Sequence, residues 1–330
     1  MHRIPLAVLL TSLVACAAEE PPAGYPTGLG TPTDPVPGPY PYLVRSRFAV
    51  PLGVPAVTGA IADLAAFSQH GGTALLAQGV GTPAAAALDA LPSTLRSKLD
   101  AWIDLELDKQ QLGTTTARQS VGQIATMAQT VVDSYIVEST LTITPTGAVH
   151  QFIDLTFQPL SIDVVVPIGG LMADTLVAKP TATVAAAGAL QLGDQRLGLA
   201  FGSHAWQALD LATDQRFGGG LGIIEQLDCN AIAQAVAARC ISGSCVGHAS
   251  DLATLCKAGL TTLVDQLRDA LSPLELHTMR FASGSAHLVD DDRDGIADRI
   301  VDGTWQLETD VGTGVHAAQV TFTAKEDTGR

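Results

Sequence analysis

The residues with the clearest chemical signature are six aspartates between positions 290 and 302. Segment 290–298 reads DDDRDGIAD, so carboxylates stand at the first, third, fifth and ninth positions of a loop. Ca²⁺ takes roughly six to eight hard oxygen ligands, and this spacing wraps carboxylates around one ion. Gly295 permits the sharp turn that such a loop needs. The pattern therefore predicts a calcium site.

This segment resembles the calcium loops of EF-hands, dockerins and thrombospondin type 3 repeats. Position 12 is Val301, where an EF-hand has an acidic residue, so the bidentate ligand is missing or replaced by Asp302. The expected ligands are the carboxylates of Asp290, Asp292, Asp294 and Asp298, the carbonyl of Ile296, and Asp302.

The residues on either side of the loop alternate like strands, at 282–289 and 303–308. We therefore expect a calcium-clipped β-hairpin over about residues 278–323 rather than a helix-opening sensor. The alternative is an acidic surface turn. Against it, only Arg293 and Arg299 offset the six aspartates, which would repel one another without a cation.

Four cysteines, Cys229, Cys240, Cys245 and Cys256, form two C-x10-C pairs separated by four residues. A separation of 11 is about three helical turns, so each pair lies on one face of a helix. An antiparallel helical hairpin over about 228–271 would bring the outer cysteines together and the inner cysteines together. The predicted disulfides are Cys229–Cys256 and Cys240–Cys245, although four cysteines allow three pairings.

The spacing is similar to the twin-cysteine hairpins of mitochondrial intermembrane-space proteins, as a shared geometry only. The alternative is a zinc site with His248 among its ligands. Zinc ligands are usually separated by two to four residues, and only Cys240 and Cys245 come near that spacing. An exported chain also meets an oxidising compartment, which favours disulfides.

Motifs for catalysis are weak. His70-Gly71-Gly72 is similar to the oxyanion loop of some lipases, but the chain has no G-x-S-x-G nucleophile elbow. Serine stands near histidine at Ser203-His204 and at Ser285-Ala286-His287, which alone does not make a catalytic triad. Asp104, Glu106 and Asp108 fit a solvated helix face better than a paired-carboxylate site. We expect no enzymatic activity.

The N-terminus has the features of an export signal. Met1-His2-Arg3 is basic, residues 4–14 are mostly apolar, and the run is too short to span a bilayer. It ends in Leu13-Val14-Ala15-Cys16, which resembles the lipobox of bacterial lipoproteins. The resemblance implies removal of signal peptide 1–15 and fatty acylation of Cys16, as in palmitate-carrying lipoproteins. Ala17, rather than Asp, implies the outer membrane. The alternative is an ordinary signal peptide with a chance cysteine.

Residues 16–42 are rich in proline and glycine and are expected to form an extended tether. Proline lacks an N–H donor, so we expect neither helix nor sheet there, and we expect Tyr25, Tyr40 and Tyr42 to be exposed. The globular body would then comprise residues 43–330.

Within the body, hydrophobic periodicity is helical over about 57–136 and 204–271, and strand-like over about 138–202 and 278–323. Helices and strands that come in blocks favour an α+β fold with an antiparallel sheet and amphipathic helices.

Composition limits the function classes. Of 330 residues, 47% are hydrophobic, which is enough for a sizeable core. With 18 basic and 33 acidic residues the net charge is −15, which disfavours a nucleic-acid partner, so we expect none. The sequence favours an outer-membrane-anchored lipoprotein in the bacterial cell envelope, as a non-enzymatic structural or interaction module. The alternative is a carrier of a lipid or other apolar ligand.

Overall fold

The computed structural model describes residues 34–48, 54–70, 92–171, 174–241, 244–245, 248–274, 276–310 and 315–327. Residues 34–330 form one compact unit. The predicted signal peptide (residues 1–15), Cys16 and Tyr25 lie outside the described residues. None of the helices in the described part of the chain has both the length and the hydrophobicity needed to cross a membrane.

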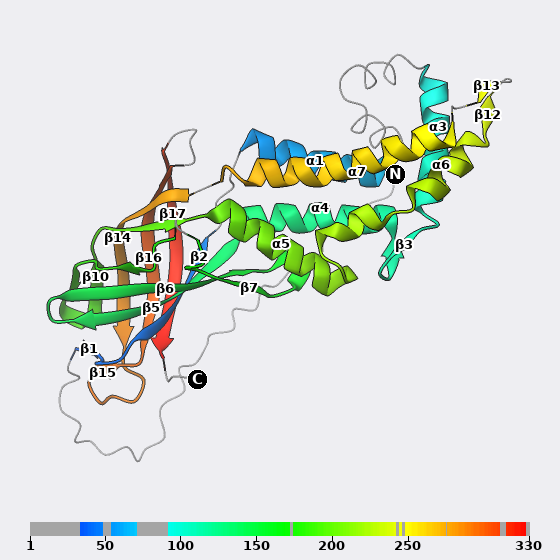
Figure 1. The fold of residues 1–330 in the computed structure, drawn as a ribbon. Coiled ribbons are helices and arrows are strands. Elements are labelled where there is room, and N and C mark those ends of the chain that lie inside the picture. The colour runs from blue at the N-terminus through cyan, green and yellow to red at the C-terminus, as the bar shows by residue number, and fades with distance from the viewer. Residues whose placement is uncertain are drawn as a thin grey trace, which may run out of the picture. The chain divides into compact units, whose positions relative to one another are not determined.

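The unit contains helices and strands in blocks, as predicted (Figure 1). The helices are α1 (Pro55–Gln69), α3 (Ser93–Leu107), α4 (Ala117–Asp133), α5 (Phe201–Phe217), α6 (Cys229–Ala237) and α7 (Ala249–Leu271), with 3₁₀ turns η1 (Pro159–Ser161), η2 (Ala186–Gly188) and η3 (Leu221–Gln226). The strands are β1 (Val36–Pro37), β2 (Tyr42–Phe48), β3 (Gln111–Leu112), β4 (Thr115–Thr116), β5 (Tyr135–Thr144), β6 (Gly147–Phe157), β7 (Val164–Pro167), β8 (Val177–Ala178), β9 (Ala182–Val184), β10 (Ala189–Leu192), β11 (Gln195–Leu199), β12 (Cys240–Ile241), β13 (Ser244–Cys245), β14 (Leu276–Val289), β15 (Ile296–Ala297), β16 (Arg299–Asp310) and β17 (Val315–Glu326).

Eleven strands form one antiparallel sheet, which confirms the predicted α+β class. Its order is β7-β6-β5-β2-β17-β16-β14-β10-β9, and β11 pairs with β14. The sheet is curled. Strands β8 and β9 are close in sequence, yet β9 pairs with β10 near one edge of the sheet and β8 pairs with β6 near the other edge. Side chains alternate along the strands, so β2 buries Tyr42, Val44, Ser46 and Phe48 and turns Arg45 and Arg47 outward.

Aromatic rings fill the inner face of the curled sheet. Trp305 stacks on Phe322 with ring centroids 4.6 Å apart, and meets Phe281 edge-on at 5.3 Å. Two glycines let these rings lie against the backbone. A Cβ at Gly284 would overlap the indole of Trp305, and a Cβ at Gly303 would overlap the ring of Phe322.

A chain of polar side chains crosses the same core. The Ser139 hydroxyl lies 2.7 Å from Nε2 of His150, and Nδ1 of His150 lies 2.9 Å from Oε1 of Gln195. Since an amide oxygen only accepts, Nδ1 carries the proton and Nε2 accepts from Ser139. The neutral imidazole is therefore satisfied at both nitrogens. Burial lowers the pKa of His150 to about 4, against a smaller opposing effect of Gln195.

The helices pack through the apolar stripes that periodicity predicts. On α4 the buried residues include Val121, Ile124, Ala128 and Val131, and the Thr116 hydroxyl accepts from the N–H of Gln119 as its N-cap. Helix α1 packs against α4 and α7, and α4 also packs against α5 (Figure 1).

The predicted disulfide between the outer cysteines is present. It joins Cys229, the first residue of α6, to Cys256 within α7, with Cα atoms 5.6 Å apart. Because both sulfurs are used in this bond, neither cysteine is available as a zinc ligand. The helical placement of the inner cysteines is wrong. Helix α6 ends at Ala237, and Cys240 and Cys245 face each other in register on strands β12 and β13.

The residue types around the inner cysteines explain this difference. Gly243 and Gly247 stand on either side of Cys245, and glycine is unfavourable inside a helix. The side chains of Cys240 and Cys245 lie outside the described residues, so their disulfide stays a prediction.

The burial of His150 predicts a pH dependence of stability. The imidazole has a pKa of about 6.5 when unfolded and about 4 when folded. As pH falls from about 6.5 to about 4, the unfolded state takes up a proton that the folded state does not, so stability is lost. Across this range, we expect the unfolding free energy of wild type to fall by about 3 kcal/mol more than that of His150→Gln.

Urea unfolding at several pH values measures this difference. The matched control is His287→Gln, because His287 is exposed on β14. If His150→Gln lost stability with falling pH as steeply as wild type, the buried neutral histidine would not be the cause.

Candidate metal centre

The acidic segment forms the connection between β14 and β16, as predicted. The two strands pair antiparallel as far as Val289 and Arg299, and the N–H of Asp298 donates to the carbonyl of Val289 at 2.8 Å. We call residues 290–298 the metal loop. The hairpin thus places the first and last residues of the loop side by side before any ion is considered.

Three of the expected ligands come together in this loop. One carboxylate oxygen from each of Asp290, Asp292 and Asp294 lies within 4.8 Å of the other two, so this group can hold a metal ion. Asp290 is half-buried and the other two are exposed. Carboxylate oxygens are hard ligands, and their chemistry suits a hard cation such as Ca²⁺ or Mg²⁺.

Backbone N–H groups fix the orientation of these carboxylates. Asp290 accepts from the N–H of Arg293 at 2.6 Å and of Gly295 at 2.7 Å. Asp294 accepts from the N–H of Ile296 at 2.7 Å. Gly295 has a φ of 92°, a backbone conformation that glycine adopts readily, which explains the glycine at this position.

The pKa values of the carboxylates diverge. Desolvation raises the pKa of Asp290, but hydrogen bonds from Gly295 and Arg293 outweigh it and hold that pKa below its ordinary value. The N–H of Asp294 lowers the pKa of Asp292, but desolvation and the negative charges of Asp294 and Asp298 leave it raised. The electrostatic repulsion between carboxylates that the sequence predicts therefore acts on Asp292.

The other expected ligands have different surroundings. The Asp298 carboxylate accepts from the N–H of Asp291 at 2.6 Å. Ile296 lies half-buried in β15. Asp302 is exposed in β16, at an irregularity between Ile300 and Gly303, with a φ of 52°. Neither Asp298 nor Asp302 belongs to the group of three among the described residues.

An ion pair offsets part of the negative charge. The guanidinium of Arg299 binds both oxygens of Asp291 at 2.6 Å, and this pair lowers the pKa of Asp291. The sequence shows Arg299 as a cation beside the loop, but its carboxylate partner follows only from the structure. The loop is thus closed by its own hydrogen bonds and one ion pair, which offset part of the repulsion among its carboxylates without a cation.

The metal loop also holds the last part of the expected tether. We call residues 34–42 the strap. Strand β1 of the strap pairs in parallel with β15 of the loop, and the N–H of Val36 donates to the carbonyl of Gly295 at 3.1 Å. The hydroxyls of Tyr40 and Tyr42 both donate to the carbonyl of Ala297, at 2.9 and 2.7 Å.

These contacts correct two expectations for the tether. Residues 36–37 do form a strand, because Val36 supplies the N–H while Pro37, which has none, is tolerated in so short an edge pairing. Tyr42 is fully buried and Tyr40 is half-buried, rather than exposed. Desolvation, aided by neighbouring negative charges, raises the pKa of Tyr40 to about 12, so its hydroxyl stays a donor.

The residues considered for catalysis have structural partners or do not converge. His204 is buried on Asp174, with Nε2 3.1 Å from both carboxylate oxygens, whereas its neighbour Ser203 is exposed. The Ser285 hydroxyl lies 3.0 Å from that of Thr304.

On α3 and at its C-cap, each candidate carboxylate has a basic partner. Arg118 binds Asp104 and Asp108, and Lys109 binds Glu106. His70 is exposed at the end of α1, and the two glycines after it lie outside the described residues.

Comparisons of the chain with family models, with curated proteins and with solved structures gave no match.

The strap contacts predict unequal effects of two conservative substitutions. Tyr42→Phe removes the buried donor to Ala297 and the acceptor of the N–H of Gly38, which lies 2.7 Å away. We expect a loss of roughly 1–3 kcal/mol in unfolding free energy, because buried polar groups lose their partners. Tyr40→Phe leaves Tyr42 on the same carbonyl, so its loss should be smaller.

Chemical denaturation of both variants measures the difference, and limited proteolysis reports release of the strap. Equal losses in the two variants, or no loss in Tyr42→Phe, would show that these hydroxyls do not hold the strap.

Proposed function

We propose that the protein is a bacterial envelope lipoprotein, held in the outer membrane by an acylated Cys16. Its folded unit acts as a non-enzymatic structural or interaction module, and Ca²⁺ stabilises its metal loop. The observation that carries this proposal is the set of hydrogen bonds from the strap to the carbonyls of Gly295 and Ala297 in the metal loop. The point at which the anchoring segment joins the fold is also the point at which a cation can bind.

The arrangement gives the cation a mechanical role. A pull on a lipid-attached tether reaches the folded unit first at the strap, where β1 has only two residues. Ca²⁺ bound by Asp290, Asp292 and Asp294 would stabilise the loop conformation that presents the carbonyls of Gly295 and Ala297. Metal binding would therefore resist peeling of the strap from the sheet.

The carrier alternative lacks a comparable observation. An apolar ligand needs an interior space, and the inner face of the sheet is occupied by the rings of Trp305, Phe281 and Phe322.

The anchoring step has a direct test. We expect the full chain, expressed in a bacterium with lipoprotein processing, to incorporate labelled palmitate and to fractionate with the outer membrane. Cys16→Ser should lose both, because the thioether is the attachment point for the lipid. Unchanged labelling of the variant, or no label on wild type, would refute the anchor.

The metal step is tested by thermal melting of the full chain in EGTA and with added Ca²⁺ or Mg²⁺. We expect Ca²⁺ to raise the melting temperature by several degrees, because it binds only the folded loop. Mg²⁺ should act much less, since it demands a smaller octahedral site and keeps its water.

The double variant Asp292→Ala, Asp294→Ala should lose the calcium response. The matched control is Asp265→Ala, Asp269→Ala, which removes two exposed carboxylates of α7. A wild-type melting temperature that ignores Ca²⁺, or an equal response in the loop variant, would reduce the loop to an acidic turn.

A further inference from the structure

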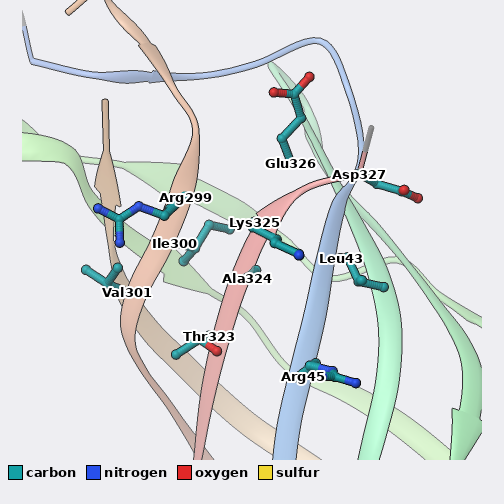
Figure 2. Close-up of a pocket in the computed structure, with 10 residues that line it drawn as sticks. All are labelled: Leu43, Arg45, Arg299, Ile300, Val301, Thr323, Ala324, Lys325, Glu326 and Asp327. Atoms are coloured by element: carbon teal, nitrogen blue, oxygen red, sulfur yellow. The ribbon is translucent and has the colours of Figure 1, made fainter. Parts of the chain in front are cut away.

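A groove of about 740 Å³ lies on strands β2, β17 and β16, close to the metal loop. Its side-chain hydrogen-bond donors face outward: Arg45 on β2, Thr323 and Lys325 on β17, and Arg299 on β16. Figure 2 shows these strands side by side. Leu43 and Val301 add apolar surface. The groove is therefore a partly apolar hollow whose donors come from three different strands.

The strand register brings like charges together. Arg299 of β16 is directly opposite Lys325 of β17, and Thr323 of β17 is directly opposite Arg45 of β2. One step further, Arg47 is opposite Thr321. Like charges directly opposite each other across a sheet are unfavourable. We call the outward side chains of Arg45, Arg47, Arg299 and Lys325 the cationic face.

Ion pairs within the protein involve only two of the four side chains of the cationic face. Arg299 binds Asp291, and Arg45 binds Glu138 across β2 and β5. Lys325 and Arg47 are exposed, and neither has an ion pair with any residue that the structure describes. In a chain of net charge −15, two such cations on adjacent strands are available for an external anion.

Two carboxylates line one end of the groove and do not neutralise its centre. Glu326 and Asp327 follow Lys325 at the end of β17, and Figure 2 shows their carboxylates beyond the lysine, at the end of the strands. Their backbone N–H groups donate to the carbonyls of Asp298 and Pro41, both at 2.9 Å, which fixes this end of the strand. They limit how far along the sheet an anion can bind.

We propose that the cationic face binds a phosphate group. The ammonium of Lys325 supplies a mobile point charge, the hydroxyl of Thr323 a neutral donor, and Arg45 the guanidinium N–H groups not used by Glu138. The open groove accepts the phosphate of a lipid headgroup or of a soluble phosphate ester. None of these contacts requires a metal in the loop or a lipid on Cys16.

The test uses the full chain carrying Cys16→Ser, so that acyl chains do not supply membrane binding. Two probes are titrated: glycerol 3-phosphate by calorimetry, and phosphatidylcholine vesicles with or without phosphatidylglycerol by flotation. We expect at least one phosphate probe to bind, with affinity that falls as salt rises. Lys325→Gln should weaken it about tenfold, the effect of losing one charge-assisted hydrogen bond.

The matched control is Lys257→Gln, which removes an exposed lysine on α7 and should bind like wild type. Arg47→Gln is the second variant, and melting curves of all variants should overlay. Binding only to the phosphatidylglycerol vesicles would assign the phosphate to a lipid, and binding only to glycerol 3-phosphate to a soluble ester. Absence of binding to both probes, or equal binding by Lys325→Gln, Arg47→Gln and Lys257→Gln, would overturn the proposal.

Discussion

The packing of Trp305 is the contact on which the curled sheet depends, because side chains from four other strands meet at this residue. Its indole N–H donates to Ser46 of β2 at 3.2 Å, and its rings contact His150 of β6, Phe281 of β14 and Phe322 of β17. A flat sheet could not bring β6 to an indole on β16, since β5, β2 and β17 lie between these two strands in the sheet order. Curling the sheet buries these rings, and their burial in turn stabilises the curl.

The same constraint explains why a polar chain is tolerated in this core. His150 stacks on Trp305, so replacing it with an aliphatic residue would lose both the stack and the partners of Ser139 and Gln195. A buried network of directional hydrogen bonds favours one arrangement of the strands that present it, whereas apolar contacts alone are less directional. The cost is sensitivity to acid, because only the neutral imidazole fits.

Local patterns allowed much of this architecture to be predicted. Period-two alternation gave the antiparallel strands, period-3.6 alternation gave the buried face of α4, and cysteine spacing gave the pair Cys229–Cys256. The three central carboxylates of the metal loop follow from spacing as well. These features share one property: the residues that interact are close in sequence or repeat with a fixed period.

Features that depend on distant register were not predictable. Tyr42 and Ala297 are 255 residues apart, and nothing local shows that a proline-rich segment docks on a loop. The opposition of Arg299 and Lys325 likewise exists only through the pairing of β16 with β17. Arg299 directly follows the metal loop and lines the groove, and its partner Asp291 is outside the group of three carboxylates. The residues proposed to bind the cation and those proposed to bind the phosphate therefore do not overlap, although the metal loop leads directly into β16, one of the strands of the groove.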